Sequence, residues 1–344
     1  MAGESHGKRA VVAALVANLA IAVAKFAGFA VTSSSAMLAE GVHSVADTGN
    51  QLLLLLGGRR ARKAATEEHP FGYGRERYFW AFVVALVLFT LGSMFAVYEG
   101  IHKLRHPEPL DSPGVAIAIL GFAMVAEGLS FRTGMKETKP VKGDATYRQF
   151  IRHAKVPELP IVLLEDLGAL IGLVIALASI ILTQTTGNDH WDAYGTLTIG
   201  GLLGVIAIIL VIEMKSLLIG ESASRKQREA IQAAIEIEPG VLQLIHMRTE
   251  HLGPDELLVC AKVEFDHRFT LPEVAEAVDR VERNVRENVP EARVMYLEPD
   301  VARDFRSQPV LTPHVPTHDV PPEIRERMEA EKRAARRPSL PPTN

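Results

Sequence analysis

Six long apolar runs constrain the fold of this chain more than any other feature of its sequence. A helix needs about 20 mostly apolar residues to cross a bilayer, and each run approaches or exceeds that length. Polar or basic segments separate the runs. We therefore expect six transmembrane helices. They cover approximately residues 11–31, 36–56, 78–101, 114–131, 157–182 and 193–218.

The chain changes character after the last run. From Ser222 onward charged residues are frequent, and short apolar patterns replace the long runs. Glu238-Pro239-Gly240 ends a predicted amphipathic helix, and Gly253-Pro254-Asp255 joins two predicted strands. The predicted order of elements is helix, strand, strand, helix, strand. This order indicates a small α+β domain with helices on one face of a sheet, which we assign to the ferredoxin-like αββαβ type.

The fold class predicted from these patterns is an all-α six-span transmembrane bundle followed by a small α+β cytoplasmic domain. The expected boundaries are 1–220 for the bundle and 221–303 for the α+β domain. The segment 304–344 is rich in proline and charge, so we expect a disordered tail. The first apolar run lacks a clear cleavage site and is followed by further spans, so no cleavable signal peptide is expected.

The loops differ in their content of basic residues. The segments between the second and third runs and between the fourth and fifth carry many Lys and Arg, and Lys8 and Arg9 precede the first run. The loops between the first and second runs and between the fifth and sixth carry none. The positive-inside rule therefore predicts a multi-pass protein of the cell membrane with both termini in the cytoplasm.

Composition and missing motifs exclude several classes of protein. The formal net charge of −4 gives no argument for a nucleic-acid partner. The single cysteine, Cys260, excludes an intramolecular disulfide framework and a Cys-rich zinc site. There is no His-Glu-x-x-His, P-loop or Gly-x-Ser-x-Gly motif, so we do not expect an enzyme.

Two of the apolar runs carry the ionisable side chains that could together form a metal site. His43 and Asp47 in the second run are four residues apart, so a helix places them on one face. A charge near the bilayer centre costs roughly 2.5–3.5 kcal/mol on insertion scales, so such groups usually face a partner or a cavity. The pair could be half of a tetrahedral metal site or an internal polar contact between helices. The acidic pair Glu165-Asp166 in the fifth run favours the metal site.

Several motifs together resemble the cation diffusion facilitator family of zinc transporters. They are Glu40-Gly-Val-His-Ser-Val-Ala-Asp47, His69-Pro-Phe-Gly-Tyr-Gly-Arg75, Asp192-Ala-Tyr-Gly195 and Gly220-Glu221-Ser222. The resemblance covers about residues 8–300. It implies proton-coupled efflux of a divalent metal cation through alternating access by a homodimer in the lipid bilayer. The metal and the protons are then substrates, and no further cofactor is implied.

The resemblance also implies a transport site built from the second and fifth helices. His43 and Asp47 match the second-helix pair, and Asp166 matches the carboxylate of the fifth helix. Four residues before Asp166 the family usually has His or Asp, whereas this chain has Val162, which cannot bind a metal.

The fourth ligand is therefore open between Glu165, water and Glu40. Glu165 points about 100° away from Asp166 on an ideal helix, so it could serve only if the helix were distorted or rotated there. A site of this composition suits zinc and could also accept manganese, iron or cobalt. The residues predicted to bind the metal are His43, Asp47, Asp166 and Glu165.

Protons compete with a metal for such ligands, which gives a simple basis for metal–proton exchange. The alternative function is a membrane metal sensor or scaffold that binds metal without transporting it. Other candidate ligands are weaker. We expect His69 to be structural, because Tyr73 stands where many members of the family have a second His. We expect His246, His251 and Cys260 to be exposed strand residues.

Overall fold

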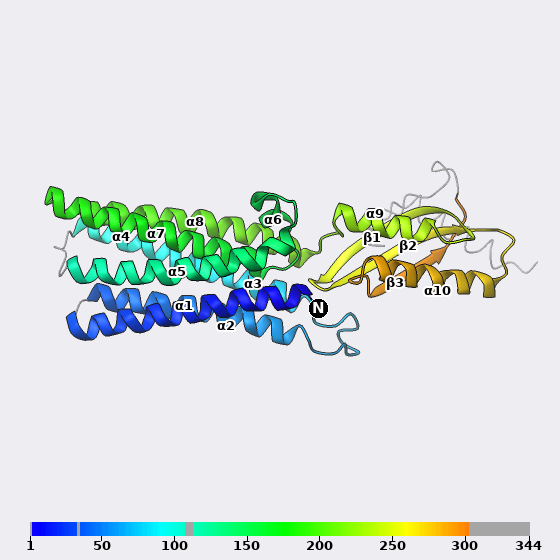
Figure 1. Ribbon diagram of the computed structural model, residues 1–344, viewed down its shortest axis with the longest axis horizontal. Helices are drawn as coiled ribbons and strands as arrows, with labels where there is room; N and C mark the ends of the chain where they lie inside the picture. Colours follow the sequence, from blue (N-terminus) through cyan, green and yellow to red (C-terminus); the bar gives the residue numbers. More distant parts are fainter. Residues whose placement is uncertain (1, 33–34, 107–112, 303–344) are drawn as a thin grey trace, which may run out of the picture. The chain divides into compact units, whose positions relative to one another are not determined.

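The computed structural model describes residues 2–32, 35–106 and 113–302, and Figure 1 shows their arrangement. Long helices form the first part of the chain, and a small α+β domain with a three-stranded sheet follows. The segment 304–344, for which a disordered tail is predicted, lies outside the described residues.

The helical part contains four segments that are long and apolar enough to cross a membrane, at Glu76–Arg105, Pro113–Lys142, Glu158–Thr186 and His190–Ile219. These contain the third to sixth predicted spans. The first two predicted spans fall on α1 and α2, in which many side chains are not described, so the count of six stays a prediction. The helices are α1 (Ala2–Thr32), α2 (Ser35–Arg60), α3 (Glu76–Val87), the π-helical η1 (Leu88–Met94), α4 (Phe95–Arg105), α5 (Pro113–Lys142), α6 (Tyr147–His153), α7 (Glu158–Thr186) and α8 (His190–Ile219).

One apolar core holds these helices together. α1 packs against α2 and α5, and α7 packs against α5 and α8. Tyr78, Leu159, Leu210 and Met214 are among the side chains that are almost completely buried in this core. Many other apolar side chains stay exposed on the outer faces of the helices, which is the pattern expected where helices contact lipid.

The third predicted span is interrupted by a π-helical segment. Within η1, the Ser93 hydroxyl donates a 2.9 Å hydrogen bond to the carbonyl oxygen of Gly200 on α8. A Cβ added at Gly204 would lie 2.7 Å from Ser93 Oγ, so glycine is needed for this close approach. Apolar periodicity does not predict the interruption, because a π-turn changes hydrogen bonding rather than composition.

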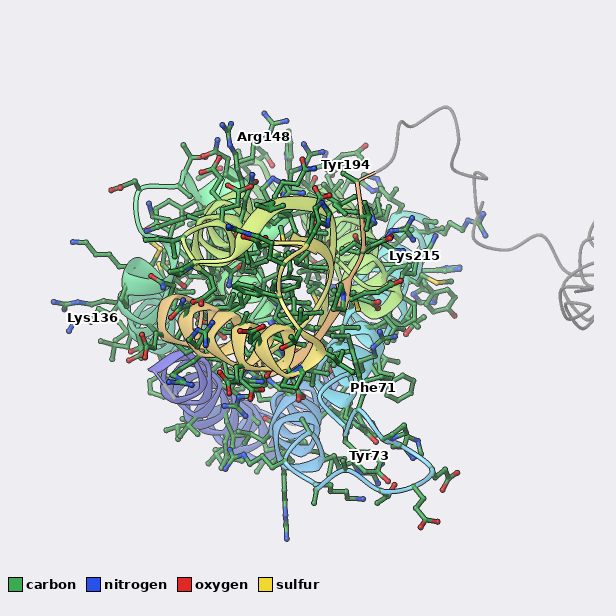
Figure 2. All side chains as sticks on the ribbon, turned by 90° about the vertical axis from the view of Figure 1, so that its right-hand side faces the viewer. Phe71, Tyr73, Lys136, Arg148, Tyr194 and Lys215 are labelled. Atoms are coloured by element: carbon green, nitrogen blue, oxygen red, sulfur yellow. The ribbon has the colours of Figure 1, made fainter. Side chains whose placement is uncertain are left out.

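The connection between the fourth and fifth predicted spans is more helical than its composition indicates. α5 runs to Lys142, about three turns past the predicted end of the span near residue 131. α6 begins with a capping box, in which Thr146 and Gln149 each bond the backbone of the other. The buried Phe150 anchors α6 on the apolar core. Figure 2 shows Lys136 and Arg148 of this region directed outward.

The α+β domain has the predicted order of elements. These are α9 (Arg225–Glu236), β1 (Val241–Gly253), β2 (Glu256–Phe265), α10 (Leu271–Asn288) and β3 (Val294–Pro299). β2 is the central strand, antiparallel to β1 and parallel to β3. The alternating residues Leu257, Val259 and Val263 of β2 are buried with residues of both α9 and α10, so the two helices share one face of the sheet. The assignment to the ferredoxin-like type stays a prediction.

Candidate functional site

A cavity of about 370 Å³ lies among the long helices, with walls from α1, α2, η1, α4, α5, α7 and α8. Several ionisable side chains line it although the surrounding helices are strongly apolar. The described ionisable residues of its wall are Asp47, Glu99, Lys103, Glu127, Glu165 and Asp192. Ionisable groups inside a membrane protein usually mark an ion or substrate path.

On α2, Asp47 and Gln51 are one helical turn apart, on the side of the helix that faces α7. Nε2 of Gln51 donates a 2.6 Å hydrogen bond to Oε2 of Glu165 on α7, and both side chains are buried. Oε1 of Gln51 and Oε1 of Glu165 are buried without a hydrogen-bond partner among the described residues. Because buried oxygens normally have a partner, these two acceptors are suited to a bound cation.

Glu165 and Asp166 follow each other on α7 but face different helices. Glu165 lines the cavity and lies close enough to Asp47 and Glu127 to interact with their charges. Asp166 accepts a 2.8 Å hydrogen bond from the hydroxyl of Ser130 on α5 and is not among the described residues of the cavity wall. α7 is a continuous helix here. The orientation of the helix about its own axis, and not a local distortion, therefore directs Glu165 toward α2.

The structure thus brings two of the predicted metal residues, Asp47 and Glu165, to one cavity. The side chains of His43 and Glu40 lie outside the described residues. Within the described part of the chain, no three His, Cys, Asp or Glu side chains are close enough together to hold a metal ion. Val162 is fully buried and belongs to the apolar core, so it takes no part in the cavity.

Sequence reasoning missed Gln51 and Ser130 and did not rank Glu127. Gln51 follows Asp47 by four residues, so it continues the polar stripe that includes His43. Ser130 follows Glu127 by three residues and therefore lies on the same side of α5. Both spacings indicate that these side chains share a helix face with a carboxylate. Amides and hydroxyls are common in membrane helices, however, so they indicate a site less specifically than charged groups do.

An ion pair lies at the end of the cavity where α4 ends and α8 begins. Nζ of Lys103 is 2.8 Å from Oδ2 of Asp192, and both side chains line the cavity. Glu99 lies one turn before Lys103 on α4 and also lines it. Acidic side chains therefore continue along the cavity wall beyond the pair of Asp47 and Glu165.

A buried arginine lies at the start of α7. Nε and Nη2 of Arg77 on α3 donate hydrogen bonds of 2.6 and 2.8 Å to the two carboxylate oxygens of Glu158. Nη1 of Arg77 is 3.0 Å from Oδ2 of Asp255, in the turn between β1 and β2. The Arg77 side chain is only 7% exposed. One guanidinium therefore connects α3, the helix that carries Glu165, and the sheet.

The weaker candidate ligands do not gather in one place. The ring of His69 stacks on Tyr73 with 4.6 Å between ring centroids, and His246 is exposed on β1. The expectation of an exposed residue is wrong for His251, which is 1% exposed, and Cys260 is half-buried. His251 pairs with the buried Leu257 and its amide bonds the main-chain oxygen of Glu221, whereas Cys260 pairs with Arg248 on the other face of the sheet. Burial, assisted by the positive charge of Lys155, lowers the pKa of His251 to about 4.

Comparison with known proteins gives a consistent result. Residues 11–219 match the family described as the cation efflux transmembrane domain, and residues 223–296 match the cytoplasmic domain of cation efflux proteins. Metal tolerance protein C4 of Arabidopsis thaliana is 31% identical over 283 residues, which are 81% of this chain and 62% of that protein.

Two further relatives differ in length. The mitochondrial proton-coupled zinc antiporter SLC30A9 of Mus musculus is 31% identical over 258 residues, 74% of this chain and 45% of the relative. The cation-efflux pump FieF of Klebsiella pneumoniae is 25% identical over 302 residues, 85% of this chain and 93% of the pump. The chain therefore spans less than two thirds of the length of the C4 and SLC30A9 relatives. It belongs to the cation diffusion facilitator family, whose members are transporters and not enzymes.

Proposed function

We propose that this chain exports a divalent metal cation across a membrane in exchange for protons, with zinc as the expected cation. The observation that best supports the proposal is the shared cavity of Asp47 on α2 and Glu165 on α7. Relatives named as a proton-coupled zinc antiporter and as a cation-efflux pump point to the same activity.

The proposed ligands are His43, Asp47, Asp166 and Glu165. Imidazole nitrogen and carboxylate oxygen are usual zinc ligands. Oε1 of Glu165, which has no hydrogen-bond partner among the described residues, supports the choice of Glu165 as the fourth ligand in place of Val162. Since each ligand must lose its proton to bind the metal, metal binding releases protons and protonation releases metal. This competition couples the two fluxes without any hydrolysis.

We propose that the metal leaves along the cavity toward the Lys103–Asp192 pair. The carboxylates of Glu99 and Asp192 line this path, so a cation moving along it could bind weakly to one carboxylate after another. At the opposite end, the first residues of α7, Glu158–Asp166, are all buried, which supports a path that is closed on that side. By the positive-inside rule we expect the Lys103 end to lie at the outer side of the membrane and both termini to lie in the cytoplasm.

The α+β domain supports a homodimer in this proposal, since it matches the cytoplasmic domain of cation efflux proteins. In this proposal residues 1–220 carry out transport and residues 221–303 form the dimer contact, as the predicted domain boundaries imply. Removing residues after Ser222 is then expected to lower the dimer fraction in detergent. An unchanged cross-linked dimer would show instead that the helices alone hold the pair.

Metal flux into proteoliposomes under an imposed pH gradient tests the proposal. Zinc, manganese, iron and cobalt are compared, and zinc uptake is expected to need the gradient. Asp47→Asn should abolish uptake while the protein elutes like the wild type. Asp144→Asn, at an exposed position in the α5–α6 loop, is the matched control and should leave flux unchanged. Zinc binding without flux in the wild type would favour the sensor or scaffold function instead.

A further inference from the structure

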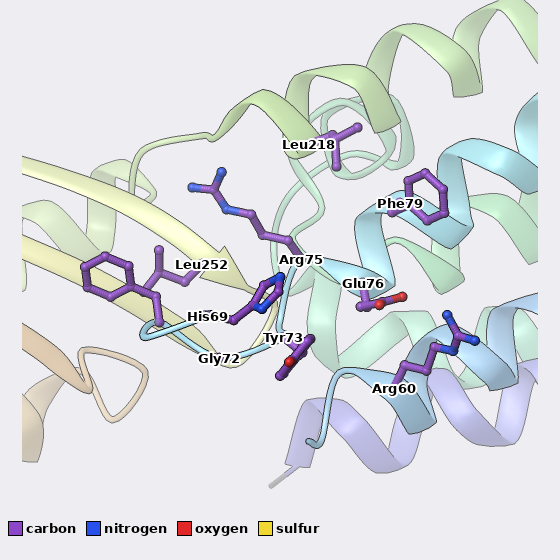
Figure 3. Close-up of a pocket in the computed structure, with 10 residues that line it drawn as sticks. Arg60, His69, Gly72, Tyr73, Arg75, Glu76, Phe79, Leu218 and Leu252 are labelled. Carbon is purple, nitrogen blue, oxygen red and sulfur yellow. The ribbon is translucent and has the colours of Figure 1, made fainter. Parts of the chain in front are cut away.

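A second hollow, of about 490 Å³, lies where α2 and α8 end and α3 begins. Its wall includes Arg60 from the last turn of α2, His69 and Arg75 from the following loop, Phe79 from α3 and Leu218 from α8. Figure 3 shows these side chains around the hollow. We propose that this hollow binds the phosphate of an anionic phospholipid. The inference is independent of which metal the chain carries.

The two arginines supply the donors that a phosphate needs. The Arg60 guanidinium lies 5.4 Å from the centroid of the Trp80 ring and forms no ion pair with a described residue. Nη2 of Arg75 bonds Glu250, whereas its Nε and Nη1 form no hydrogen bond within the described part of the chain. Guanidinium groups present several N–H donors in a planar fork that fits phosphate oxygens.

The charge balance of the wall favours an anion. Glu76 is the acidic side chain among the described lining residues, and its Oε2 accepts a 2.7 Å hydrogen bond from Trp80 Nε1. The wall therefore carries two guanidinium groups and one carboxylate. Arg75 is paired with Glu250 outside the wall, so Arg60 is the guanidinium of the wall that forms no ion pair with a described residue. Arg59, Lys63 and Lys215 are exposed near the ends of α2 and α8 and do not line the hollow, and basic residues at such positions are expected to attract anionic lipid.

The apolar part of the wall distinguishes a lipid from a free phosphate. Phe79 is 45% exposed and lies one turn inside the apolar segment that begins at Glu76. Arg60 and Arg75 lie at the polar ends of their helices, at the level where headgroups are found. A lipid whose phosphate lies between these arginines would therefore run its acyl chain along Phe79 and Leu218.

Native mass spectrometry of the full chain in detergent tests the inference. Phosphatidylglycerol and phosphatidylcholine of equal acyl length are added, and phosphatidylglycerol should be retained preferentially. Arg60→Gln should lower its retained fraction by about fivefold or more, because the fork that holds the phosphate is lost. Arg59→Gln is the matched control, since it removes the same charge from the neighbouring exposed residue outside the hollow. It should change retention by less than about twofold.

Four results would overturn the inference. Equal losses in Arg59→Gln and Arg60→Gln would show diffuse attraction to the basic surface, and equal retention of the two lipids would show no headgroup selection. Full competition by water-soluble glycerophosphoglycerol would show a phosphate site without a lipid. A shift in the monomer–dimer ratio of Arg60→Gln at constant lipid would show that a second copy of the chain covers the hollow. If Arg60→Gln does not elute like the wild type, Arg60→Lys, which keeps the charge but loses the fork, gives the same comparison.

Discussion

Gln51 and Glu165 are 114 positions apart in the sequence, yet Nε2 of Gln51 lies 2.6 Å from Oε2 of Glu165. The bond joins the two helices that carry the proposed metal ligands. It leaves Oε1 of Glu165 without a partner among the described residues. The amide therefore fixes the carboxylate while one of its oxygens stays available to a cation.

Gln51→Ala should weaken zinc binding without abolishing transport. A hydrogen bond to a charged group contributes roughly 1.5–3 kcal/mol, so the zinc dissociation constant should rise roughly ten- to hundredfold. Isothermal titration with zinc measures this change. Gln184→Ala, at an exposed position on α7, should have no effect. An unchanged zinc affinity in Gln51→Ala would mean that the bond only packs α2 against α7.

Glu165→Gln and Asp166→Asn separate the two carboxylates of α7. If both bind the metal, each substitution should lower zinc flux roughly 100-fold or more, because a neutral amide replaces a deprotonated ligand. Ser130→Ala should cause a smaller loss, roughly tenfold, since it removes only the partner that orients Asp166. Normal flux in Asp166→Asn would make that residue a packing carboxylate and leave Glu165 as the ligand from α7.

Arg77→Gln should strongly destabilise the protein. Breaking a buried ion pair leaves an uncompensated charge on Glu158 and costs roughly 3–5 kcal/mol. Thermal unfolding in detergent measures the loss, and the double variant Arg77→Met with Glu158→Leu should recover most of it. Arg75→Gln removes an exposed ion pair with Glu250 and should cost only about 0–1 kcal/mol. Equal losses at the two arginines would contradict the distinction.

The stability of the α+β domain should fall in mildly acidic solution. Burial and the nearby Lys155 lower the pKa of His251 from 6.5 to about 4. Between these pH values the unfolded chain binds a proton that the folded chain does not, so the free energy of unfolding decreases as pH falls from about 6.5 toward 4. His251→Phe should flatten this dependence in pH-resolved thermal unfolding. His246→Phe, at an exposed position of the same strand, should retain it.

Orientation in the membrane can be tested with single cysteines. In a Cys260→Ser background, a cysteine introduced at Asn188 should react with an impermeant maleimide on intact cells. One introduced at Lys139 should react only after the cells are opened, because the loops rich in Lys and Arg are predicted to be cytoplasmic. The reverse pattern would overturn the orientation and the proposed direction of export.

Local patterns predicted most of the fold. Apolar runs located the third to sixth spans, and alternation with turn residues gave the order of elements in the α+β domain. The sequence also indicated that Glu165 and Asp166 diverge by about 100°. It could not tell which of them faces α2, because the rotation of a helix depends on packing against helices that are distant in the sequence.

The contacts that complete the site were not predictable for the same reason. The pairs Gln51–Glu165 and Ser130–Asp166 join residues on separate helices, and neither leaves a pattern within a short window of sequence. Burial of His251 likewise depends on residues far away in the sequence, Lys155 and Glu221. The main-chain oxygen of Glu221 accepts a 2.8 Å hydrogen bond from the His251 amide. Single-sequence reasoning ranks residues by charge, so it found the carboxylates and missed their neutral partners.

The π-helical segment η1 has a geometric consequence for the part of its span that follows it. A π-turn holds one residue more than an α-turn, so every side chain after Met94 is rotated by roughly 100° relative to a continuous α-helix. Glu99 and Lys103 reach the cavity with this offset in place. The side chains that this part of the span presents to the cavity therefore depend on the number of residues in the span as well as on their identity. Loss of one residue between Leu88 and Met94 would turn both charges away from the cavity although neither charged residue is itself changed.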